Sequence, residues 1–388
     1  MTPGSEVLER ARALRPAIAA YADRIEAERR LPPPLSDALH DAGMFRMLLP
    51  RSLGGAELDP PTFVQVMEEI AQADASTAWV LGQTAGCSMV AAYLQPVVAK
   101  AIFGSPRGVL AWGSGPQGRA VAVEGGYHLT GSWSYASGIR EATWIGAHTF
   151  VVSADGSPRR HPDGAPVIRT LLFPVEQATI TDVWDVMGLR GTGSDTYAVE
   201  DLFVPEEHSA ARDDAAERRE HGPLYCFSSG TLYASGFACV SLGVARALLE
   251  AYLVLAGEKT AHRAKRPLRE SPVVQAQVAL GDARLRAARA HLLATLAEVG
   301  ESARTTGELT LAQRVRIRQA ASYASREGRE VGTQVFHAAG AQAIFASGPW
   351  ERRLRDLHTV AQQLQGRDDH FEAVGRFLLG LPPDSPFI

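Results

Sequence analysis

The stretch Gly125-Gly126-Tyr127-His128-Leu129-Thr130-Gly131-Ser132-Trp133-Ser134-Tyr135-Ala136-Ser137-Gly138 decides the fold of this chain. Apolar and polar residues alternate from Tyr127 to Tyr135, which predicts a β-strand. The glycine pair before this strand and the Ser-Gly step after it are typical of turns. We therefore expect a β-hairpin that carries a wide aromatic residue, Trp133, and a small hydroxyl, Ser137, to its rim.

A second glycine-rich stretch, Gly188-Leu189-Arg190-Gly191-Thr192-Gly193-Ser194-Asp195, leads into a predicted strand over residues 196–204 that Pro205 ends. A strand rather than a helix follows the glycines, so this is not the dinucleotide-binding fingerprint, and a nicotinamide site is not expected. Together the two stretches predict a cradle for a flat, anionic cofactor.

The net charge, the lengths of the apolar runs and the number of cysteines exclude several classes of protein. The 388 residues carry a formal net charge of -4, which argues against nucleic acid as a partner. We find no run of about 18 apolar residues, so we expect no membrane contact and a soluble, cytoplasmic protein. The three cysteines are too few and too irregularly spaced for a disulfide framework or a zinc site, and no metal is expected.

The residue pattern changes from helical spacing to strand alternation and back again. These changes divide the chain into an N-terminal helical domain (1–107), a middle β domain (108–212) and a C-terminal helical bundle (213–388). The fold class is therefore α+β, mostly α, with a four-helix bundle as the natural packing of the last part. The helices expected in the first part span residues 6–30, 36–47, 60–73 and 76–94, with Pro32-Pro33-Pro34 ending the first of them.

Two connecting segments and one break are also predicted. Residues 154–166, rich in Gly, Pro, Asp and Arg, form an exposed hairpin loop, and the charged residues 206–222 form a solvated linker or a short exposed helix. Residues 300–308 separate two long helices of the bundle. We find no G-x-S-x-G elbow, no H-E-x-x-H and no P-loop, so hydrolase and phosphoryl-transfer functions lose support.

Three motifs then occur in order: Trp133-Ser134-Tyr135-Ala136-Ser137-Gly138, Met187-Gly188-Leu189-Arg190-Gly191-Thr192-Gly193-Ser194 and Arg352-Arg353-Leu354-Arg355-Asp356-Leu357-His358. Together with the order of the helical, β and helical parts of the chain, these motifs resemble the acyl-CoA dehydrogenase fold, in the branch that contains two-component flavin-dependent monooxygenases. The resemblance implies a flavin, FMN or FAD, supplied reduced by a separate flavin reductase. It also implies O₂ and a small organic substrate that is hydroxylated or N-oxygenated, and a homotetramer.

The resemblance assigns roles to the glycine-flanked motifs. Ser137 would be catalytic, with its hydroxyl on the N5 side of the flavin, beside Gly138 and an aromatic wall at Trp133. On the residues alone, Ser137-Gly138 is as readily a simple turn, and a tryptophan such as Trp133 is more often a core residue than a cofactor wall. Arg190, with Gly191, Thr192 and Ser194, would bind the flavin phosphate or simply form a tight loop. Arg263 would reach a phosphate, from a neighbouring subunit, or belong to a solvated basic loop.

The substrate pocket implied by the resemblance departs from the family pattern. Members often carry one His eight residues after the tryptophan of the buried helix and another seven after the Arg-Asp pair, and here these positions are Cys87 and Gln363. Gln cannot act as a base near neutral pH, and Cys is a poor substitute for His. His358 would also line the pocket, or be a satisfied, partly buried histidine; Cys87 would face the flavin or be inert filler.

Two other functions stay open from the sequence. An acyl-CoA or carrier-thioester dehydrogenase would need a carboxylate base, and the comparable stretch, residues 343–349, offers none. The other is a flavin-free, non-catalytic binding scaffold, which would take up no reduced flavin.

Overall fold

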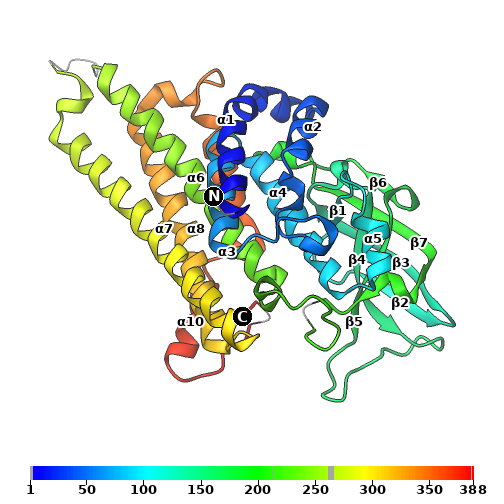
Figure 1. Ribbon diagram of the computed structural model, residues 1–388. Coiled ribbons are helices and arrows are strands. Elements are labelled where there is room, and N and C mark those ends of the chain that lie inside the picture. The colour runs from blue at the N-terminus through cyan, green and yellow to red at the C-terminus, as the bar shows by residue number, and fades with distance from the viewer. Residues whose placement is uncertain (1–2, 213, 261–265, 386) are drawn as a thin grey trace.

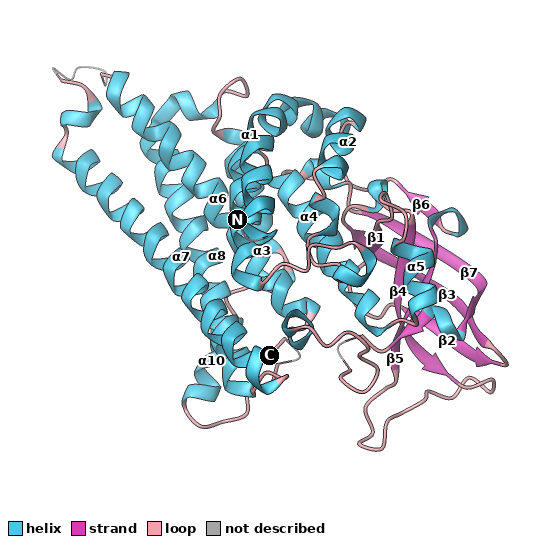
Figure 2. Ribbon diagram, in the orientation of Figure 1, coloured by secondary structure: helices cyan, strands magenta, loops and turns pink. Residues whose placement is uncertain are grey.

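The computed structural model describes residues 3–212, 214–260, 266–385 and 387–388. A β-sheet lies on one side, long helices lie on the other, and the shorter N-terminal helices pack between them (Figures 1 and 2). This arrangement confirms the α+β, mostly α, class.

The helices share a simple division: the first five precede the sheet, and the rest follow it. They are α1 (Pro3–Glu28), α2 (Pro33–Asp41), α3 (Pro60–Ala73), α4 (Ala75–Ser88), α5 (Pro96–Phe103), α6 (Ser229–Glu258), α7 (Pro272–Thr306), α8 (Leu311–Ala339), α9 (Glu351–Gln362) and α10 (His370–Leu378).

The strands form one sheet in the order β6-β7-β3-β2-β4-β5-β8, with β1 paired to β4. They are β1 (Leu110–Trp112), β2 (Gly118–Val123), β3 (Gly126–Ala136), β4 (Trp144–Val152), β5 (Ile168–Pro174), β6 (Thr179–Thr181), β7 (Asp195–Pro205) and β8 (Ser209–Ala210). β2 and β3 form the expected hairpin, turning at Gly125 with a left-handed φ of 76°. β7 then pairs antiparallel with β3, which brings the two glycine-rich stretches together.

Some helix ends differ from the sequence expectation. Pro32-Pro33-Pro34 does not end α1, which stops at Glu28; Pro33 instead begins α2, where a missing backbone N–H costs nothing. The helix expected over residues 36–47 ends at Asp41, because Gly43 takes a left-handed conformation, and a short 3₁₀ turn follows. The helix expected over 76–94 ends at Ser88 and continues as a 3₁₀ turn.

Two later segments also differ. The helix α7 runs through Gly300 and ends at Thr306, where Gly307 at a φ of 75° supplies the stop. The charged segment 206–222 is not only a solvated linker, since Ser209 and Ala210 form the buried edge strand β8. Residues 154–166 form the expected exposed connection, between β4 and β5.

The apolar core has two parts, one among the helices and one inside the sheet domain. Helix α6 contributes the largest share of the first part and contacts α3, α4, α7, α8 and α9. It is the one described helix long and apolar enough to cross a membrane, but 67% of its most apolar window is buried within the fold. Such burial is typical of a core helix.

Candidate active site

A chain of hydroxyl groups lies where the end of β3, the 188–195 loop and α4 meet. Ser137 Oγ lies 2.6 Å from Ser194 Oγ, and Ser194 Oγ lies 2.7 Å from Thr192 Oγ1. Thr192 Oγ1 donates to the backbone carbonyl of Leu189 at 2.9 Å. From the other side, Trp79 Nε1 on α4 donates to Ser137 Oγ at 3.1 Å. The structure thus joins three predicted site residues, Ser137, Thr192 and Ser194, and adds Trp79.

A bulge in β3 places Ser137 at this junction. The pairing of β3 with β7 shifts register between Trp133 and Ala136, and Tyr135 takes a left-handed φ of 62° that turns its ring outward, 65% exposed. Gly138, also left-handed, donates its backbone N–H to the Thr192 carbonyl. A side chain at Gly138 would approach within 2.8 Å of Thr84 on α4, so only glycine allows this close contact.

The 188–195 loop is wedged between helices rather than open to solvent. A Cβ at Gly191 would fall 2.0 Å from Ile25 of α1 and 2.9 Å from Ser76 of α4. The loop amides of Thr192 and Gly193 bond to carbonyls within the loop itself. This packing positions the Thr192 and Ser194 hydroxyls, and the Thr192 amide, which we expected to bind a phosphate, is already engaged.

Arg190 is also engaged by the protein. Its guanidinium donates to Asp185 at 2.9 Å and to the Val186 carbonyl at 2.7 Å, with Glu26 at 3.8 Å. The structure therefore favours the tight-loop interpretation of Arg190 over the phosphate one. Arg263 lies outside the described residues.

Trp133 lies inside the sheet domain instead of at its rim. The side chain is fully buried, stacks on Tyr197 at 5.3 Å between ring centroids, and donates its Nε1 hydrogen to the His148 carbonyl at 2.7 Å. Glycines make the space for it, since a Cβ at Gly118 or Gly131 would approach its ring within 2.2 and 2.6 Å. Trp133 therefore offers no free face to a cofactor, and we leave it out of the candidate site.

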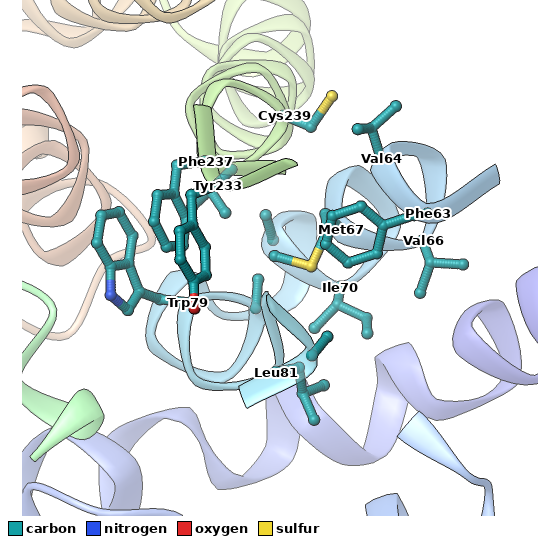
Figure 3. Close-up of a cluster of buried hydrophobic side chains, with 14 of the residues drawn as sticks. Phe63, Val64, Val66, Met67, Ile70, Trp79, Leu81, Tyr233, Phe237 and Cys239 are labelled. Atoms are coloured by element: carbon teal, nitrogen blue, oxygen red, sulfur yellow. The ribbon is translucent and has the colours of Figure 1, made fainter. Parts of the chain in front are cut away.

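Trp79 supplies the aromatic wall beside Ser137. Its ring stacks on Phe237 of α6, with centroids 3.7 Å apart and planes 5° from parallel, and Phe237 stacks on Tyr233 at 5.6 Å. Figure 3 shows these three rings side by side between α4 and α6. Sequence reasoning missed Phe237 and Tyr233; their spacing of four residues on an apolar helix was the available signal.

Cys87 lies at the end of this aromatic stack. Its thiol contacts the Tyr233 hydroxyl at 3.4 Å, and Gln83 donates to the sulfur at 3.7 Å. Burial raises the pKa of the Cys87 thiol to about 12. The thiol therefore stays protonated near neutral pH and cannot replace the missing histidine as a base.

The other two pocket candidates, His358 on α9 and Gln363 just after the end of that helix, belong to a different set of contacts. His358 Nε2 lies 3.3 Å from Thr333 Oγ1 on α8, and Gln363 Oε1 accepts from the Gln365 backbone N–H at 2.6 Å. Within the described residues, no hydrogen bond links either side chain to the Ser137 chain. Two cavities, of about 370 and 70 Å³, lie among α1, α3, α6, α7 and α8, and neither is lined by Ser137.

Asp356 anchors the loop to α9. Its carboxylate accepts from the Leu189 backbone N–H at 2.6 Å, whereas the neighbouring Arg355 pairs with Glu26 and Glu351. Arg355 and Asp356 do not form an ion pair with each other. Burial, reinforced by nearby Asp74, raises the pKa of Asp356 to about 7.

Comparison with known proteins follows the same division of the chain. The model described as "Acyl-CoA dehydrogenase, N-terminal domain" matches residues 6–98, and "Acyl-CoA dehydrogenase, C-terminal domain" matches residues 235–365. These two matches cover most of the helices that precede and follow the sheet in the sequence, and they define the class of protein by its fold.

Individual relatives show to which branch of this class the chain belongs. The oxygenase subunit HsaA of a flavin-dependent monooxygenase from Mycobacterium tuberculosis is 30% identical, over 97% of this chain and 95% of its own length. Indole-3-acetate monooxygenase from Pseudomonas putida is 28% identical, over 92% of this chain and 90% of its own. The structure of XiaF from Streptomyces, in complex with FADH2 and glycerol, superposes with a TM-score of 0.90 at 26% identity, covering 99% and 97% of the two chains.

The chain belongs to the acyl-CoA dehydrogenase superfamily, in its branch of two-component flavin-dependent monooxygenases. It is an oxidoreductase that uses a reduced flavin, and the family expected from the three sequence motifs is confirmed.

Proposed function

We propose that the chain receives reduced FAD from a separate reductase and transfers one oxygen atom from O₂ to a small aromatic or amine substrate. The reaction balances as substrate, O₂ and FADH2 giving oxygenated substrate, water and FAD. FADH2 in the XiaF structure supports FAD over FMN. The term "oxygenase subunit" for HsaA supports a separate reductase.

The observation that carries this proposal is the Ser137 hydroxyl, held between Trp79 and Ser194 at the edge of the sheet domain. Ser137 is 6% exposed, so its hydroxyl lies in a nearly dry environment. A flat ring with polar atoms along one edge fits a hydroxyl next to an aromatic wall. We propose that Ser137 and Gly138 contact the flavin, which supplies the electrons that activate O₂.

The protein residues around this position would bind and shield rather than exchange protons. Trp79 and Phe237 present a buried aromatic stack, and exclusion of water suppresses wasteful release of hydrogen peroxide. Cys87 is protonated and Gln363 is neutral, so no base is available at the two positions where relatives often carry a histidine. We therefore propose substrates that need little help in losing a proton, such as an electron-rich ring or an amine nitrogen.

The test is oxygenation with ¹⁸O₂ in the presence of an added reductase and NADH. Indole-3-acetate and a tertiary amine would serve as first probes, with mass spectrometry of the products. One ¹⁸O atom per product molecule supports the proposal. Oxidised probes that carry no ¹⁸O would contradict the proposal. Complete conversion of O₂ to peroxide across a broad panel of aromatic and amine probes would contradict it as well.

We also propose that the protein is a homotetramer and cytoplasmic. Exposed apolar side chains support self-association, because α6 and α7 leave large ones in solvent: Leu253, Val254, Val273 and Leu280. The boundaries at residues 107 and 212 are likewise a proposal, testable by limited proteolysis.

A further inference from the structure

The hydroxyl chain has a fixed direction, because its hydrogens can be counted. Three oxygen–oxygen contacts of 2.6, 2.7 and 2.9 Å run from Ser137 through Ser194 and Thr192 to the Leu189 carbonyl. Each contact of this length needs one hydrogen between the two oxygens. The carbonyl has none to give, so the three hydroxyl hydrogens must fill the three contacts, one each.

The only arrangement that satisfies this count has every hydroxyl donating toward Leu189. Thr192 donates to the carbonyl, Ser194 donates to Thr192, and Ser137 donates to Ser194. The Leu189 carbonyl also accepts from Trp184 Nε1 at 2.9 Å and from the Thr192 backbone N–H at 3.2 Å, so every partner there is a donor. Burial of Thr192 and Ser194, each 2% exposed, keeps water from reversing the chain.

The direction decides what Ser137 can offer to a ligand. A hydroxyl has one hydrogen and two lone pairs. The hydrogen points to Ser194, and one lone pair accepts from Trp79 Nε1. Among the described residues no other donor bonds to Ser137 Oγ, so its remaining capacity is one lone pair. Ser137 is thus an acceptor toward whatever lies beside it.

We propose that Ser194 and Thr192 are positioning residues that hold Ser137 as an acceptor and thereby make the site select reduced over oxidised flavin. The inference rests on the proposed function, which brings the flavin to Ser137. Reduced flavin carries a hydrogen at N5 and can donate it to Ser137. Oxidised flavin has only a lone pair at N5, which would face another lone pair and leave both groups unsatisfied.

This selection has a use in an oxygenase that obtains its flavin from a separate protein. Preference for the reduced form draws it from the reductase, and weaker binding of the oxidised form releases it after turnover. The donor direction of one hydroxyl chain would contribute to both the uptake of reduced flavin and the release of oxidised flavin, without any movement of the fold.

The test compares the dissociation constants of oxidised and reduced FAD under anaerobic conditions, together with the midpoint potential of the bound flavin. Ser194→Ala frees the Ser137 hydrogen, and Thr192→Val removes the end of the chain, so either variant lets Ser137 donate. Thr192→Ser keeps the chain. Thr196→Val is the matched control, since it removes a nearby hydroxyl that bonds Ser134 instead.

We expect the preference of the wild type for reduced FAD to fall about tenfold in Ser194→Ala and Thr192→Val, and to persist in Thr192→Ser and Thr196→Val. A tenfold change in that ratio lowers the two-electron potential of the bound flavin by about 30 mV. Because the ratio is measured on one folded protein, a general loss of affinity leaves it unchanged.

Two outcomes would overturn the inference, and they separate it from the function on which it rests. If Ser194→Ala and Thr192→Val bind flavin with the wild-type ratio, the hydroxyl chain does not set the preference, and the proposed function stands. If the wild type binds neither form of FAD nor of FMN, the proposed function fails as well.

Discussion

Trp79 has two tasks at the scale of single residues. Its indole N–H bonds Ser137, and its ring stacks on Phe237. The first task concerns the orientation of the hydroxyl and the second concerns the packing of α4 against α6. Because the two are carried by different atoms, substitution can separate them.

Trp79→Phe keeps a ring for stacking but loses the N–H, so we expect the free energy of unfolding to fall by about 1 kcal/mol from the lost hydrogen bond, with a further loss for the smaller ring. Trp79→Ala should cost about 3–5 kcal/mol, because it leaves a large cavity. Urea unfolding followed by circular dichroism measures both. Equal losses in the two variants would show that the ring contributes nothing beyond its N–H.

Close contacts at glycines position the elements. In the sheet domain Gly118 on β2 lies against the benzo ring of Trp133 on β3, where any side chain would overlap it. At the helical interface a Cβ at Gly86 would fall 2.2 Å from the ring of Tyr233, so this glycine brings α4 close to α6. The first contact fixes the packing of β2 on β3, and the second fixes the packing of α4 on α6.

Gly118→Ala should lower stability by about 1–3 kcal/mol through overpacking. Trp133→Phe removes the ring atoms that the new methyl would strike, so the double variant should lose less than the sum of the single losses. Gly257→Ala, where no atom lies within 4 Å, is the control and should be neutral or stabilising. Additive losses in the double variant would contradict the packing account.

The order of the elements was predictable from the sequence, because alternation in β3 and helical spacing in the bundle are local signals. The buried position of Trp133 was not predictable from the sequence. Strict alternation puts Trp133 and Tyr135 on one face, and the left-handed Tyr135 that separates them has no local sequence signal. Similarly, the glycines of the 188–195 loop suggested an anion cradle, whereas Gly191 packs against Ile25 and Ser76, which are distant in sequence.

At the scale of the whole molecule, Asp356 links the C-terminal helices to the sheet domain through Leu189. Its pKa in the folded state, about 7, lies above the ordinary value of 3.8. Its contribution to stability is therefore fully present below about pH 4 and is lost as the pH rises through about 7. Above that range a buried carboxylate must stay charged.

Asp356→Asn removes this titration while keeping an oxygen that can accept from Leu189. We expect the melting temperature of the variant, relative to wild type, to be higher at about pH 8 than at about pH 5. Thermal melts at the two values measure the difference. Asp155→Asn, at an exposed loop carboxylate with no contact to this cluster, is the control. A pH-independent difference for Asp356→Asn would contradict the raised pKa.

Assembly is the second prediction at this scale. Light scattering should give four times the chain mass of 41.6 kDa. Glutamate at the exposed Val273 and Leu280 of α7 should shift the protein to smaller species, since charges do not tolerate burial in an apolar interface. Val97→Glu, at an equally exposed position on α5, should not. A monomeric wild type would refute the tetramer.

We expect reduced flavin to react with O₂ beside Ser137. Rapid mixing of the anaerobic complex of the protein and reduced FAD with O₂, followed by the absorbance of oxidised flavin, tests it most directly. We expect this absorbance to return after a delay in the wild type and promptly, with peroxide release, in Ser137→Ala. Prompt return in the wild type, with one peroxide released per flavin, would contradict it.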